Sequence, residues 1–120
     1  MAYVAAGVSS CHEPISAEEV RERLRLGLYV MAREGSIRRE LDAVSRIKDM
    51  NVDLRRLILV TDGLYPKDLL KNGSEEFALQ RAIDCGFDPM EALRMATLNV
   101  AERFALDGIL GGIAPGKYAD

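Results

Sequence analysis

The apolar run Leu-Ile-Leu-Val at residues 57–60, continued by Thr61, most constrains how this chain can fold. The run has no polar residue at alternate positions, so it predicts a strand covered on both faces, as strands of a parallel sheet are. Two shorter β-compatible runs precede it, at residues 7–11 and 28–32, and the second also looks apolar on both faces. Segments with helical character separate the runs, so the order predicts an α/β fold of parallel β/α units.

Capping residues predict where the first helices begin and end. Ser16 with Glu19 three residues later fits a capping box, in which the serine accepts from the N3 amide and the glutamate reaches back to the cap amide. Gly27 suits the end of that helix, because glycine adopts the left-handed conformation cheaply. Ser36 predicts the cap of a second helix, whose apolar positions 37, 41, 44 and 47 follow helical spacing.

The segment after the third strand is predicted to be mostly helical. Residues 74–85 have helical character, and Asp88 followed by proline is a strong helix start. Asn99 looks like the cap of a further helix. Glycines and a proline between residues 108 and 116 predict a loop at the end of the chain.

Length and composition exclude several classes of protein. The chain has 120 residues, with 48% hydrophobic and 29% charged residues, which suits one globular domain. The net charge of −3 and the absence of a basic cluster argue against nucleic-acid binding. No apolar run approaches the ~20 residues of a membrane span, and no secretory signal is recognisable. Cys11 and Cys85 are too few for a disulfide framework, so we expect reduced thiols in a cytoplasmic protein.

Two architectures fit this order of elements. One is a small complete α/β domain, and the other is a part of a (β/α)8 barrel, which takes ~250 residues. In both, functional residues gather at the carboxyl ends of parallel strands. This rule selects residues 10–13, 33–36 and 61–63 as candidate sites.

His12 and Asp62 are the two candidates with the most direct chemistry. His12 is the only histidine in the chain and follows a predicted strand, so it is either a metal ligand or acid–base group, or an ordinary loop histidine. Asp62 closes the most apolar strand, where a carboxylate needs a partner, although Asp-Gly is also a common turn. Together the two side chains would form an incomplete set of metal ligands.

Other polar residues at the same strand ends are weaker candidates. Glu13 adjoins His12, and a loop there could bring both side chains to one rim. Arg33, Glu34 and Ser36 either contact a ligand or form a turn followed by a helix cap.

Five segments, read in order, resemble the adenine deaminase family of the amidohydrolase superfamily. They are residues 9–13 (Ser-Ser-Cys-His-Glu), 23–36, 59–63 (Leu-Val-Thr-Asp-Gly), 92–99 and 113–120. The resemblance implies a distorted (β/α)8 TIM-type barrel that converts adenine and water to hypoxanthine and ammonia. It also implies a divalent, binuclear metal centre of manganese, iron or zinc.

The resemblance assigns roles to the candidate residues. His12 would be the metal ligand at the end of strand six, and Asp62 would be the strand-eight aspartate that contacts metal and takes the proton of the nucleophile. Substrate contacts would come from Glu13, Arg33, Glu34 and Ser36. One departure is Cys11, because the family usually has an acid before this histidine.

The rest of the family's metal ligands have no counterpart in these 120 residues. The resemblance therefore implies that residues 1–120 are a partial domain, comprising strands six to eight of the barrel, with residues 106–120 leading toward a small β domain. The missing N-terminal half of the barrel would be the partner. Alone, the chain is expected to be inactive, to bind metal weakly at most, and to form homo-oligomers through unpaired sheet edges. Two alternatives remain open: a non-catalytic α/β binding or assembly module, and another amidohydrolase acting on a cyclic amide or aminopurine.

Overall fold

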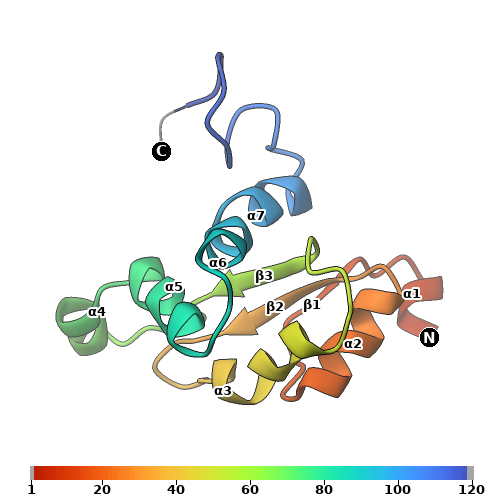
Figure 1. Cartoon of the computed structure of the whole chain (residues 1–120), viewed down its shortest axis with the longest axis horizontal. Coiled ribbons are helices and arrows are strands. Elements are labelled where there is room, and N and C mark those ends of the chain that lie inside the picture. The colour runs from red at the N-terminus through yellow and green to blue at the C-terminus, as the bar shows by residue number, and fades with distance from the viewer. Residues whose placement is uncertain (1, 119–120) are drawn as a thin grey trace.

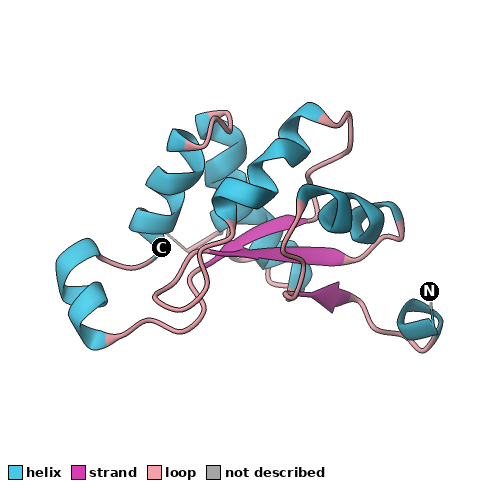
Figure 2. Cartoon of the chain, turned by 90° about the horizontal axis from the view of Figure 1, so that it is seen from below, coloured by secondary structure: helices cyan, strands magenta, loops and turns pink. Residues whose placement is uncertain are grey.

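A computed structural model describes residues 2–118, and these residues form a three-stranded parallel sheet. The strands are β1 (Ser10–Cys11), β2 (Tyr29–Arg33) and β3 (Leu57–Val60), in the spatial order β1-β2-β3. Both pairings are parallel, which confirms the predicted β/α arrangement. Figure 2 shows the short β1 at the edge of the sheet.

The first strand is shorter than predicted. Residues 7–9 lie outside β1, and a short helix, α1 (Ala2–Ala5), precedes them. Gly7 has a φ of 92°, a left-handed conformation that turns the chain between α1 and β1. Only two residues therefore pair with β2.

Helices connect the strands and follow the last one. Figure 1 shows α4 and α5 beyond the carboxyl ends of β2 and β3, and α1 near the opposite end of the sheet. The remaining elements are α2 (Ala17–Arg25), α3 (Leu41–Val44), a 3-10 helix η1 (Ser45–Asp49), α4 (Pro66–Asn72), α5 (Glu75–Asp84), α6 (Pro89–Ala96) and α7 (Leu98–Arg103).

The core lies between the helices and one face of the sheet. Val30 pairs with Leu57 and Ala32 with Leu59, and all four side chains are buried against helical residues. On β2, the intervening Tyr29 and Met31 are only partly buried. The expectation that β2 is covered on both faces is therefore wrong for the described residues, because the helices pack against the face that carries Val30 and Ala32.

Two of the predicted helix caps are confirmed. The Ser16 hydroxyl accepts from the amide of Glu19 at 3.3 Å, and Asp88 accepts from the amides of Met90 and Glu91. The Glu19 carboxylate bonds to the amide of Ile15 instead of that of Ser16. The hydrogen bond from the glutamate of the capping box is thus shifted by one residue, from the amide of the cap residue Ser16 to that of Ile15.

The other two predicted caps are wrong. Ser36 does not begin a helix, because its hydroxyl accepts from the distant amide of Tyr65 at 2.9 Å, and α3 begins only at Leu41. Asn99 lies within α7 and does not cap it. Its buried amide group donates instead to the carbonyl oxygens of Leu54 and Leu57, which ties α7 to β3.

The chain after α7 contains neither helix nor strand as far as residue 118, in agreement with the predicted loop. Figure 1 shows this segment extending away from the sheet. Across residues 2–118, none of the helices has the length and apolar character that crossing a membrane requires.

Candidate functional site

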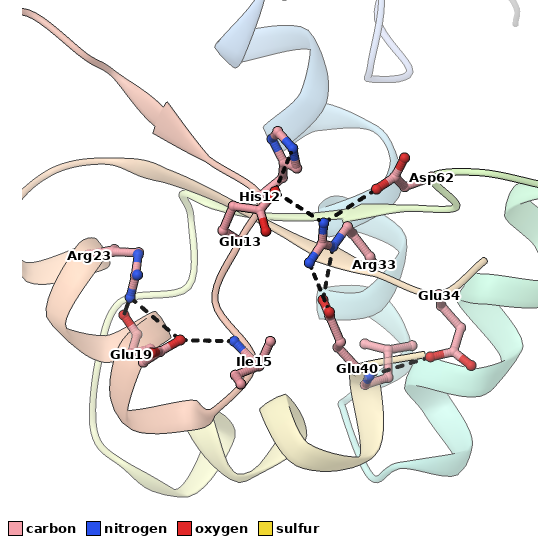
Figure 3. A network of polar contacts seen from close by, with 10 residues as sticks. His12, Glu13, Ile15, Glu19, Arg23, Arg33, Glu34, Glu40 and Asp62 are labelled. Carbon is pink, nitrogen blue, oxygen red and sulfur yellow. Dashed lines mark hydrogen bonds and ion pairs between the residues drawn. The ribbon is translucent and has the colours of Figure 1, made fainter. Parts of the chain in front are cut away.

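The carboxyl ends of the three strands bring together the residues that sequence reasoning selected. β1 leads into His12 and Glu13, β2 ends at Arg33, and β3 leads into Asp62. Figure 3 shows these four side chains directed toward one another. The parallel topology places them together, because all three strands end at the same edge of the sheet.

Arg33 is the centre of this cluster. Its side chain is only 4% exposed, and it makes a bidentate ion pair with Glu40, through Nε to Oε2 at 3.0 Å and Nη2 to Oε1 at 2.8 Å. The remaining nitrogen, Nη1, lies 3.4 Å from a Glu13 oxygen and 3.5 Å from a carboxylate oxygen of Asp62. The hydrogen bond with Glu40 is the main cause that raises the pKa of Arg33 above its usual value. A fixed positive charge therefore lies between three carboxylates.

His12 reaches the same cluster through Glu13. Its Nε2 lies 3.1 Å from Oε1 of Glu13, the oxygen that also contacts Arg33. The side chains of His12 and Glu13 are more than half exposed, and that of Asp62 is nearly half exposed. Solvent and ligands therefore have access to the cluster. His12 and Asp62 thus share one edge of the sheet and are linked through Glu13 and Arg33.

The donor set suits a metal ion in type but not in number. An imidazole nitrogen and carboxylate oxygens are ligands that zinc, iron and manganese accept. Among residues 2–118, however, no group of three or more such side chains is placed to hold a metal ion. A complete catalytic site therefore needs further ligands, since such sites use three or more protein groups.

Glu34 and Ser36, the other two candidates, have their polar atoms engaged elsewhere. The Glu34 carboxylate is buried, accepts from the amide of Leu41 at 3.4 Å and lies 3.7 Å from Nε of Arg81. Burial is the main cause that raises the pKa of Glu34. The Ser36 hydroxyl accepts from Tyr65, as described above. Neither side chain faces the cluster around Arg33.

Glu40 is the member of the cluster that sequence reasoning missed. The helix predicted from apolar positions 37, 41, 44 and 47 included residue 40 without giving it a role, whereas the structure keeps residues 37–40 outside a helix. Glu34 forms an isolated antiparallel bridge with Arg39, which folds this segment back on β2. The available signal was Arg33 itself, because an arginine ending an apolar strand needs a buried acid.

The chain is similar to known proteins over nearly its whole length. The description of the matching family is "Amidohydrolase family", and the match covers residues 4–120. The adenine deaminase of Moorella thermoacetica is 44% identical over 119 residues, and that of Cenarchaeum symbiosum is 44% identical over 120 residues. The adenine deaminase of Oceanobacillus iheyensis is 45% identical over 119 residues. These alignments cover 98–99% of this chain and 20% of each relative, so the chain spans about a fifth of their length.

Proposed function

Because the chain belongs to the amidohydrolase family, we propose that it contributes to a metal-dependent adenine deaminase, which converts adenine and water to hypoxanthine and ammonia. The observation that carries the proposal is that His12 and Asp62 lie at the same edge of a parallel sheet and are linked through Glu13 and Arg33. The similarity to proteins named adenine deaminase supports adenine as the substrate.

In this proposal, the three β/α units are strands six to eight of a (β/α)8 barrel. The parallel order of the strands supports it, and so does the partly exposed second face of β2, which would look into the barrel. The other strands would come from a further part of the protein, and residues 106–120 would lead toward a β domain. Residues 119–120 lie outside the described part of the chain.

His12 and Asp62 would hold a divalent metal, of manganese, iron or zinc, together with ligands from the rest of the barrel. A metal bound there supplies a hydroxide nucleophile by lowering the pKa of its water. The amidohydrolase family is generally metal-dependent, which supports this assignment. The incomplete ligand set of residues 2–118 leads us to expect weak metal binding by the isolated chain.

Asp62 is the group we assign to proton transfer. Its carboxylate would accept the proton of the attacking water and deliver it to the amino group at C6, which then leaves as ammonia. Glu13 keeps an exposed carboxylate at the same edge, so it is the side chain that we assign to substrate contact. Arg33 is buried and paired with Glu40, so we assign it to positioning Glu13 and Asp62 and not to substrate contact.

The test is a chimera in which this chain replaces the matching segment of the Moorella thermoacetica adenine deaminase. We expect the chimera to release ammonia from adenine, and Asp62→Asn to reduce kcat by about 10²–10⁴-fold, as loss of an acid–base group does. Asp107→Asn, at an exposed position in the C-terminal loop, is the matched control and should leave kcat unchanged. Turnover of the Asp62→Asn chimera within about tenfold of the parent would refute the assigned role.

The 120-residue chain by itself serves as a second test. We expect it to release no ammonia from adenine, to remain in the cytoplasm, and to self-associate through the unpaired edges of β1 and β3. Sedimentation that shows a monomer at high concentration would contradict the last expectation. Deamination by the isolated chain would show that the further ligands are not needed.

A further inference from the structure

We propose that residues 33–36, the last residue of β2 and the loop that follows it, are a positioning element that holds Asp62 in place through both its side chain and its backbone. The inference rests on the proposed function only in giving Asp62 a catalytic role. Arg33, Gly35 and Ser36 are then positioning residues, and their substitution acts on turnover more than on substrate binding.

The side chain of Asp62 is held by Arg33. Nη1 of Arg33 lies 3.5 Å from Oδ2 of Asp62, while Glu40 immobilises the other side of the same guanidinium group. Because the guanidinium is planar, fixing Nε and Nη2 also fixes the position of Nη1. The carboxylate of Asp62 therefore faces a charge that cannot move away from it.

The backbone around Asp62 is held by the next three residues of the loop. The amide of Glu34 donates to the carbonyl oxygen of Val60 at 2.8 Å, and the amide of Ser36 donates to that of Gly63 at 3.2 Å. These two bonds lie on either side of Asp62 in the chain. The Ser36 hydroxyl then accepts from the amide of Tyr65 at 2.9 Å, which secures the exit from the turn.

Gly35 permits this close approach. A Cβ atom at position 35 would overlap the carbonyl oxygens of Thr61 and Asp62. The two loops are therefore in direct backbone contact, and no other residue fits at position 35 without separating them.

Asp62 needs such support because its own backbone is unusual. Its φ is 45°, in the left-handed region, and that of Gly63 is 70°. Aspartate tolerates this conformation better than most residues, but the surrounding structure must still maintain it. The contacts with residues 34–36 provide that constraint.

Amide hydrogen exchange of the 120-residue chain tests the positioning without any catalysis. Ser36→Ala should accelerate exchange at the Tyr65 amide about tenfold, the effect of losing one hydrogen bond, whereas Ser36→Thr, which keeps the hydroxyl, should restore protection. Gly35→Ala should shift the amide resonances of Asp62 and Gly63. Gly108→Ala is the matched control, since a Cβ at that glycine meets no atom within 4 Å.

The chimera described above separates positioning from substrate binding. Gly35→Ala should lower kcat at least about tenfold with KM within about threefold, because a misplaced catalytic group lowers turnover. A raised KM with unchanged kcat would overturn the proposal and make this loop a substrate contact. Unaltered amide exchange in the Ser36→Ala chain, together with unaltered resonances in the Gly35→Ala chain, would also overturn it. If Asp62→Asn leaves turnover intact while the exchange results hold, the proposed function fails but the positioning of Asp62 stands.

Discussion

Replacing Arg33 by methionine should destabilise the fold strongly, because it leaves Glu40 buried without a partner. Arg33 is 4% exposed and the Glu40 side chain 9%, and two short hydrogen bonds join them. Removing one member of a buried ion pair costs about 3–5 kcal/mol. The contacts of Arg33 with Glu13 and Asp62 add little, since both carboxylates are largely solvated and such pairs contribute about 0–1 kcal/mol.

A double-mutant cycle separates the pair from general damage to the core. Urea unfolding would be measured for Arg33→Met, Glu40→Leu and the double variant. We expect the double variant to lie within about 2 kcal/mol of the parent, because apolar residues of similar volume often replace a buried ion pair without loss. The coupling energy should therefore exceed about 2 kcal/mol. A loss below about 1 kcal/mol for Arg33→Met, or additive losses in the double variant, would refute this reasoning.

Three further predictions concern other parts of the fold. Burial raises the pKa of Glu75 from 4.5 to about 7, so the folded state binds more protons in that range and the free energy of unfolding should fall as pH rises from 4.5 to 7. Glu75→Gln should flatten this slope, whereas Glu18→Gln, at an exposed first-turn position, should keep it; an unchanged slope in Glu75→Gln would contradict the prediction. Asn99→Ala should cost about 1–3 kcal/mol in urea unfolding, because it leaves the carbonyl of Leu57 without this donor. Asp88→Ala should lower stability by about 1 kcal/mol through loss of the α6 cap, and an unchanged melting temperature would argue against it.

The parallel sheet and the place of the candidate site could be predicted from the sequence. Short apolar runs separated by helical segments predicted the β/α order, and His12 and Asp62 were expected at strand ends on that basis alone. Ser16 and Asp88 were correctly identified as caps. In each case the signal lies within a few residues of the position that it describes.

The errors have the opposite character. Ser36 and Asn99 both look like helix caps locally, yet their polar atoms bond to residues 29 and 42 positions away. Glu40 lay within a predicted helix and was given no role, but it is the buried partner of Arg33. A short polar side chain can form its hydrogen bonds with residues near it in the sequence or far from it, and sequence patterns predict only the bonds to nearby residues.

The sequence by itself predicted three parallel strands and the edge of the sheet at which His12 and Asp62 lie, because apolar runs, helix caps and chain direction can be recognised from neighbouring residues. Only the tertiary structure decided that Arg33 is buried against Glu40 and that Gly35 and Ser36 pack against the turn containing Asp62. Buried polar groups must find partners, and which partner is within reach depends on how elements distant in the chain pack together.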